Sequence, residues 1–125
     1  MDEITIEHLR SAVNMCGFDF DDIVSSHTNK RAYTDMRAII WHILQSETGA
    51  SYAQIGKRFK WNRATVFYSL NKAHELREYD REFCNLYDSV YSYYMHFEST
   101  AGNEENGFES TVSEGVGESL AGEAR

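Results

Sequence analysis

The chain has 125 residues, enough for one domain with a single hydrophobic core. Hydrophobic residues make up 42% of it and aromatic residues 14%, which excludes a wholly disordered chain. The formal net charge is −8, and no apolar run approaches the ~20 residues of a transmembrane helix. The first residues, Met1-Asp2-Glu3, lack the basic and apolar segments of a signal peptide, so we expect a cytoplasmic protein. The absence of proline favours long helices.

Apolar residues recur with helical spacing from the start of the chain. The first predicted helix covers residues 6–16, with Thr5 as its N-cap and Gly17 as its stop. Asp19 is expected to cap a short second helix, because an aspartate side chain can accept from the free backbone N–H groups there. Polar and basic residues from Ser25 to Tyr33 then predict a loop.

The third predicted helix has the most regular apolar pattern in the chain. We expect it to begin after Thr34, with Asp35 in its first turn, and to end at Gly49. Its apolar residues recur every three or four positions, as on one face of a helix: Met36, Ile39, Ile40, Ile43 and Leu44.

Two shorter helical segments follow in close succession. Ser51 and Gln54 form the S-x-x-Q pattern of a capping box, which predicts the start of a fourth helix. The expected inward residues of this helix are Ala53, Ile55 and Phe59. A short turn at Lys60-Trp61 leads to Asn62, the expected cap of a fifth helix over about residues 62–76. The expected inward residues of the fifth helix are Val66, Ser69, Leu70, Ala73 and Leu76.

The last predicted helix is rich in aromatic residues, and an acidic tail follows it. Asp80 is expected to cap a helix over residues 80–97, with an inward face of Phe83, Leu86, Tyr87, Val90, Tyr94 and Phe97. Low hydrophobicity and high negative charge predict that residues 99–125 are disordered. The sequence thus predicts an all-α bundle of five to six helices in residues 1–98, followed by a disordered acidic tail. That tail either competes with an anionic ligand for a basic surface or keeps the protein soluble.

The positive charges of this acidic chain are concentrated in its middle. Residues 30–72 carry a net charge of +6, because only Asp35 and Glu47 offset eight basic residues: Lys30, Arg31, Arg37, Lys57, Arg58, Lys60, Arg63 and Lys72. A local basic block is typical of a surface that binds phosphate groups. The alternative is a solvated face of mixed charge.

The fourth and fifth helices, joined by a tight turn, have the pattern of a helix-turn-helix. In that motif the N-terminal end of the second helix enters the major groove of DNA. The residues at that end are Asn62, Arg63, Ala64 and Thr65, and the next turn offers Tyr68 and Lys72. Arginine can bind guanine, asparagine can bind adenine, and alanine or threonine can contact a thymine methyl. The alternative is an ordinary helical hairpin.

Three pieces of the chain, in order, carry a family resemblance. The first is Lys30-Arg31 with the helix Met36–Leu44, the second is Ser51–Phe59 with the sequence S-Y-A-Q-I-G-K-R-F, and the third is Thr65–Leu76. Together they resemble the C-terminal DNA-binding domain of the bacterial replication initiator DnaA. In that family the first piece corresponds to a basic loop and a long helix, the second to an S-L-x-E-I-G-x-x-F helix, and the third to the end of the R-D-H-[ST]-T-V signature and the recognition helix that follows.

This resemblance implies that Arg37 reads the minor groove, that Thr65 contacts the major groove, and that Lys57 or Arg58 contacts phosphate. Asn62-Arg63-Ala64 stands where the family has its Asp-His pair, so the resemblance does not carry over the DNA target of the family. The residues predicted to contact DNA are Lys30, Arg31, Arg37, Ser51, Lys57, Arg58, Lys60, Asn62, Arg63, Ala64, Thr65, Tyr68 and Lys72.

The expected function is sequence-preferring binding of double-stranded DNA through this helix-turn-helix. We expect a stand-alone module of a bacterium or phage, replication-related or regulatory and associated with the nucleoid. No G-x-x-x-x-G-K-[ST] motif is present, so we expect no ATPase. We expect no other enzyme activity, cofactor, metal or small-molecule substrate, since no C-x-x-C pattern, nucleophile elbow or EF-hand spacing occurs.

A second hypothesis assigns function to the aromatic helix over residues 80–97. Aromatic side chains concentrate at protein interfaces, so this helix could form a homodimer. Alternatively, its tyrosines are half exposed and one face packs on the first helix. In the competing function the chain is a protein-interaction module that uses this helix and has lost DNA binding.

Overall fold

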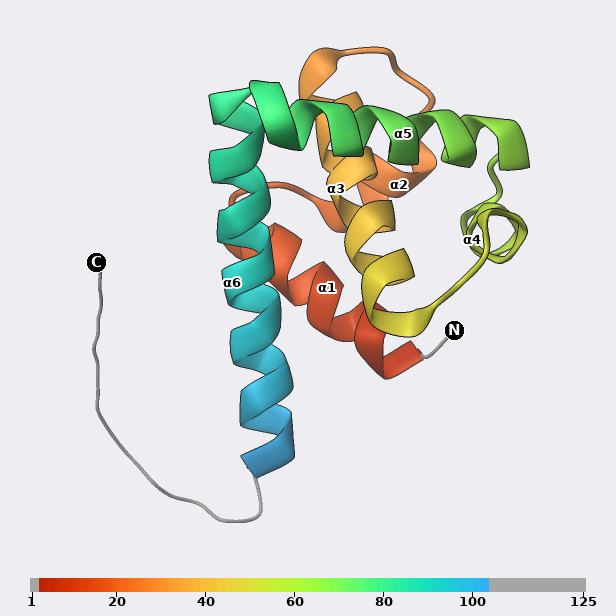
Figure 1. Cartoon of the computed structure of the whole chain (residues 1–125). Coiled ribbons are helices and arrows are strands. Elements are labelled where there is room, and N and C mark those ends of the chain that lie inside the picture. The colour runs from red at the N-terminus through yellow and green to blue at the C-terminus, as the bar shows by residue number, and fades with distance from the viewer. Residues whose placement is uncertain (1–2, 104–125) are drawn as a thin grey trace.

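The computed structural model describes residues 3–103, and these residues fold entirely into α-helices and their connections (Figure 1). The all-α prediction is therefore confirmed for this part of the chain. The helices are α1 (Glu3–Met15), α2 (Phe20–Ser25), α3 (Arg31–Thr48), α4 (Tyr52–Phe59), α5 (Arg63–Tyr79) and α6 (Arg81–Asn103). None of the helices in this part is long and apolar enough to cross a membrane.

Most helix ends follow the capping residues of the sequence. The Asp19 carboxylate accepts from the backbone N–H of Asp22 at the start of α2. Both hydrogen bonds of the predicted capping box are present, one from the Gln54 N–H to the Ser51 hydroxyl and one from the Ser51 N–H to the Gln54 side chain. Gly49 ends α3 with a φ of 73°, a left-handed conformation that glycine adopts without steric cost.

Two predicted N-caps are wrong. Thr5 lies inside α1, which begins at Glu3, and its side chain is buried. Thr34 lies inside α3, where its hydroxyl donates to the carbonyl of Arg31. The loop between α2 and α3 is consequently shorter than predicted and covers residues 26–30.

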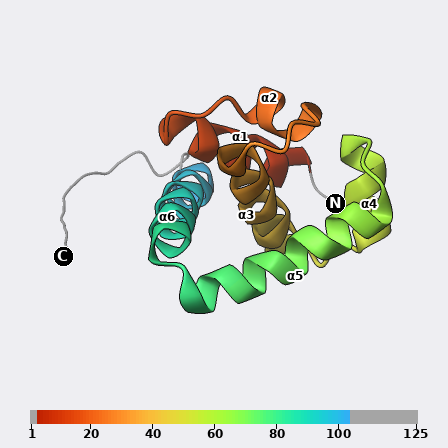
Figure 2. The same ribbon diagram turned by 90° about the horizontal axis from the view of Figure 1, so that it is seen from above.

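Helix α3 lies at the centre, with the other helices around it (Figure 2). Its predicted apolar residues are all buried, and Trp41 beside them is fully buried as well. Ala53 of α4 is exposed, contrary to the prediction, while Ile55 and Phe59 are buried as expected. On α5, Val66, Leu70 and Ala73 are buried.

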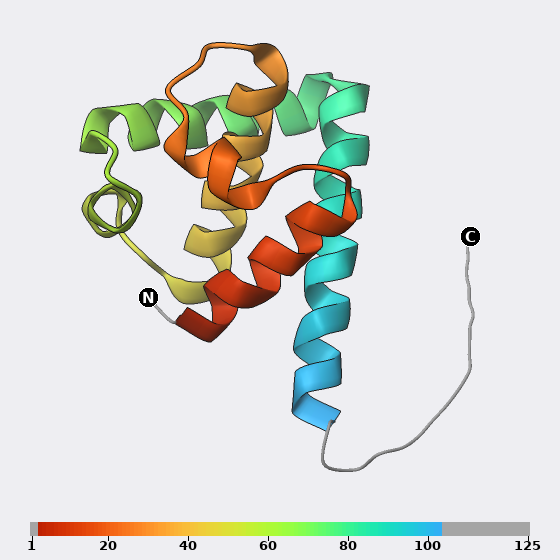
Figure 3. The same ribbon diagram turned by 180° about the vertical axis from the view of Figure 1, so that it is seen from behind.

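Helix α6 packs along α1 and closes the bundle (Figure 3). Asp80 caps it by accepting from the Phe83 N–H at 2.9 Å, and the buried face of Phe83, Tyr87, Val90 and Tyr94 agrees with the prediction. The helix continues to Asn103, so the predicted start of the tail at residue 99 is wrong by at least one helical turn. The rest of the predicted tail, residues 104–125, lies outside the described residues.

Candidate nucleic-acid interface

Helices α4 and α5 are joined by a tight turn whose geometry depends on Gly56. The Trp61 N–H donates to the Gly56 carbonyl at 2.8 Å, and Lys60 between them has a left-handed φ of 62°. A Cβ atom added to Gly56 would lie 2.5 Å from the Trp61 carbonyl oxygen, closer than packed atoms approach. Gly56 therefore allows α5 to start directly against α4, as a helix-turn-helix requires.

Trp61 attaches this turn to the rest of the domain. Its indole N–H donates to the Val24 carbonyl at 2.6 Å, at the end of α2. Its ring packs edge-on against buried Trp41, with 5.5 Å between the ring centres, and stacks on the His27 ring, with 4.0 Å between the centres. The start of α5 is thereby fixed relative to α3 and to the loop over residues 26–30.

The side chain of Arg37 is buried inside the domain and does not lie on the surface. Its side chain is only 4% exposed, and its guanidinium donates to the carbonyls of Ser26 and of Thr28, the latter at 2.8 Å. The same group lies 4.6 Å from the centre of the Trp61 ring. Burial lowers the pKa of Arg37. In this arrangement Arg37 cannot enter a DNA groove, contrary to the prediction, and instead holds the loop over residues 26–30 against the turn.

The first residues of α5 are exposed together. Arg63, Ala64 and Thr65 all face solvent, and no carboxylate among residues 3–103 forms an ion pair with Arg63. Asn62 has the predicted capping role, since its side-chain oxygen accepts from the Ala64 N–H at 2.7 Å. This bond uses one of the two lone pairs of the amide oxygen. Arg63 is the charged side chain at this exposed helix end.

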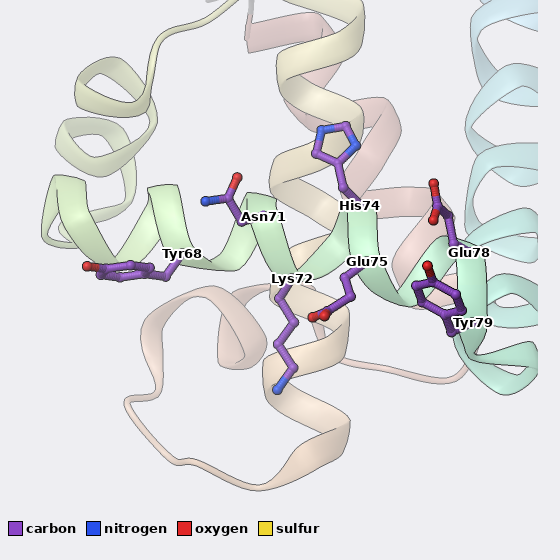
Figure 4. A pocket seen from close by; sticks show the side chains of 7 residues that line it. All are labelled: Tyr68, Asn71, Lys72, His74, Glu75, Glu78 and Tyr79. Carbon is purple, nitrogen blue, oxygen red and sulfur yellow. The ribbon is translucent and has the colours of Figure 1, made fainter.

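The charge of the exposed side chains of α5 shown in Figure 4 changes from positive to negative along the helix. Tyr68, which is 69% exposed, lies in the N-terminal part, and Lys72 lies near the middle on the same side. Glu75 follows on that side, and Glu78 lies further towards α6, on the side of Asn71 and His74. A surface that attracts phosphate can therefore extend along α5 only as far as Lys72, because carboxylates near a phosphate backbone are repelled.

The remaining predicted contacts fall into two groups. Lys30, Lys57 and Lys60 are exposed and form no ion pair among the described residues. The two arginines have intramolecular partners: Arg31 pairs with Asp35 at 3.1 Å and with Asp80 at 2.5 Å, and Arg58 makes two 3.0 Å bonds to Glu3. Ser51 serves as the cap of α4. The free positive charges on α4, in the turn and at the start of α5 are therefore Lys57, Lys60 and Arg63. Lys30 precedes Arg31, which pairs with Asp80 at the other end of α5.

A second polar cluster joins α3, α5 and α6. The Tyr87 hydroxyl and His42 Nδ1 are 2.6 Å apart, the His74 ring lies 4.8 Å from the His42 ring, and the Arg77 guanidinium lies 3.9 Å from the centre of the Tyr87 ring. Burial raises the pKa of Tyr87 to about 12 and, with the nearby His74 and Arg77, lowers the pKa of His42. Within the described part of the chain, no group of three or more His, Cys, Asp or Glu side chains could hold a metal ion.

Comparison with known proteins gives no match for this chain among protein-family models, curated proteins or solved structures. The resemblance to the DnaA domain therefore rests on the three sequence pieces alone and stays a prediction.

Proposed function

We propose that the chain binds double-stranded DNA through α4, the turn and α5, as a replication-related or regulatory module. The observation that carries the proposal is the exposed, unpaired Arg63 at the start of a helix whose position is fixed by Gly56 and Trp61. Such a helix end can enter the major groove, where an arginine binds guanine through two hydrogen bonds.

The proposed contacts divide into base reading and phosphate binding. Arg63 reads a base, with Ala64 and Thr65 beside it. Lys57 and Lys60 lie on α4 and in the turn next to this end of the helix, and Lys72 lies further along α5. These lysines contact phosphates, which fixes the register of the protein on the duplex. Lys30 lies in the loop over residues 26–30, which Arg37 holds close to the turn.

Fluorescence anisotropy with a selected DNA duplex and a salt series tests the proposal. We expect Arg63→Ala to cost about 1–3 kcal/mol at one base position and to relax sequence preference there. Lys57→Ala should weaken binding to all sequences alike and reduce the dependence on salt. Arg81→Ala, which removes an exposed arginine at the start of α6, is the matched control and should bind as the wild type does.

Two outcomes would contradict the proposal. If neither the full chain nor residues 1–103 bind duplex DNA at low salt, DNA binding is not the function. If Arg63→Ala and Lys57→Ala lose affinity uniformly over all sequences, α5 is not the recognition helix. Tighter binding by residues 1–103 than by the full chain would show that residues 104–125 compete with DNA.

A second candidate function is supported by an apolar hollow between α1 and α6. It has a volume of about 530 Å³ and is lined by Met15, Ser92, Tyr93, His96 and Phe97. The apolar side chain of Met15 is 57% exposed. Large exposed apolar surfaces often mark sites of protein interaction. We propose, as the alternative to DNA binding, that the chain is a protein-interaction module that uses this face of α6. A second copy of the chain is the simplest partner, and a monomeric molar mass at high protein concentration would exclude that homodimer.

A further inference from the structure

A largely apolar hollow lies on α5 immediately beside Arg63. Its volume is about 420 Å³, and it is lined by Tyr52, Asn62, Arg63, Ala64, Phe67 and Tyr68. The three aromatic rings contact one another edge-on, with 5.2 Å between the centres of Tyr52 and Phe67 and 5.5 Å between those of Phe67 and Tyr68. The mutual contacts hold the rings in place before any ligand arrives.

Within this aromatic surface, Tyr52 packs against the hydrophobic core, whereas Phe67 and Tyr68 have no part in it. Val66 and Leu70 supply the buried face of this stretch of α5, whereas Phe67 is 38% and Tyr68 69% exposed. Ala64, one turn before Tyr68, is also exposed and leaves space between the rings and the helix backbone. Exposed apolar surface next to a polar side chain that can bind a ligand is typical of a binding site.

The major groove of DNA offers an apolar group of the right kind. The 5-methyl group of thymine projects into the groove, whereas the neighbouring edges of the bases present hydrogen-bond donors and acceptors. Cytosine acquires the same apolar projection only when it is methylated at C5. We infer that Ala64, Phe67 and Tyr68 bind the 5-methyl group of a pyrimidine in the major groove, next to the base that Arg63 contacts.

This inference rests on the proposed function, and it predicts one chemical feature of the target site. A selected duplex should contain thymine at a defined distance from the guanine read by Arg63. The pair of contacts would distinguish the site by one hydrogen-bonded base and one methyl group.

Uracil substitution tests the inference, because it removes the methyl group of thymine and changes nothing else on the base. Each thymine of the selected site is replaced in turn, and affinity is measured by anisotropy with the full chain. We expect one or two positions at which affinity falls roughly three- to fivefold, the effect of burying about one methyl group. With cytosine or 5-methylcytosine at the same position, the methylated base should bind more tightly by a similar factor.

Phe67→Ala should bind the thymine and uracil duplexes with nearly equal affinity. Tyr79→Ala, which shortens an exposed aromatic residue at the opposite end of α5, should keep the wild-type difference. Far-UV circular dichroism checks that both variants are folded. If the wild type binds the duplex but no uracil substitution changes its affinity, the inference is wrong and the proposed function stands. If the wild type binds no duplex at all, the proposed function itself fails.

Discussion

Arg37 shows how a single charged side chain can be buried without a carboxylate partner. Three backbone carbonyls surround its guanidinium, those of Ile23, Ser26 and Thr28. Two of these residues lie at or just beyond the C-terminal part of α2, where carbonyl groups are not all used by the helix. Hydrogen bonds to these oxygens offset the cost of removing the charge from water.

Replacing Arg37 by methionine keeps the volume of the side chain but removes all of these bonds. We expect Arg37→Met to lower the free energy of unfolding by about 2–4 kcal/mol, because the carbonyls left behind are buried and unpaired. Chemical denaturation measures the loss. Arg81→Met, on the exposed surface of α6, should change stability by less than about 0.5 kcal/mol. An equally small effect at Arg37 would contradict its role in positioning the loop.

For single residues, the sequence predicted which side chains cap most of the helices, but it did not predict which side chains form long-range contacts. The caps at Asp19, Ser51 and Asn62 were predictable because capping is a local interaction within three residues. The partners of Arg37 lie 9 to 14 residues away, and the partner of Arg58, Glu3, lies 55 residues away. Such contacts depend on how the helices pack, and a pattern of charges along the chain cannot show them.

At the scale of the element, Gly56 determines how closely α4 and α5 meet. Glycine in the middle of a helix normally costs about 0.5–1 kcal/mol relative to alanine. We expect the opposite here: Gly56→Ala should destabilise the protein by about 1–3 kcal/mol, since its Cβ would overlap the Trp61 carbonyl. Thermal unfolding measures the effect.

The same substitution should also weaken DNA binding, because a displaced turn moves Arg63. Ala53→Gly on the exposed side of α4 is the control for glycine content. It should lose stability through helix propensity alone and leave DNA affinity unchanged. A gain in stability for Gly56→Ala would show that the turn does not require the close approach.

The first residues of α1 and α3 could not be predicted from the local sequence. Thr5 and Thr34 are good N-cap residues, yet each helix starts earlier, because tertiary packing extends α1 to Glu3 and α3 to Arg31. Arg58 pairs with Glu3, and Arg31 pairs with Asp80 at the corner between α5 and α6. These long-range ion pairs accompany the additional turns, and the local pattern contained no sign of them.

For the whole molecule, the cluster around His42 predicts a dependence of stability on pH. The pKa of His42 is lowered in the folded protein by burial and by His74 and Arg77. Below its ordinary pKa of about 6.5, the unfolded chain therefore takes up a proton that the folded protein resists. Stability contributed by neutral His42 is complete above that pH and is lost as the pH falls towards the lowered value.

Denaturation between pH 7 and pH 5 should consequently show a smaller loss of stability for His42→Gln than for the wild type. His96→Gln, at an exposed position of α6, should lose stability as the wild type does. Identical pH profiles for all three proteins would mean that the α3–α5–α6 cluster does not titrate with folding.

The corner at Asp80 has a mechanical consequence. Only this residue separates α5 from α6, and α5 is held at both ends, by Trp61 at its start and by the Arg31–Asp80 ion pair at its end. Its 17 residues give a length of about 25 Å at 1.5 Å per residue. A tilt of about 5° of a helix of this length would displace Arg63 by about 2 Å, more than half of the ~3.4 Å step between base pairs. Because α5 is a beam supported at both ends, such a tilt requires one of these two attachments to break.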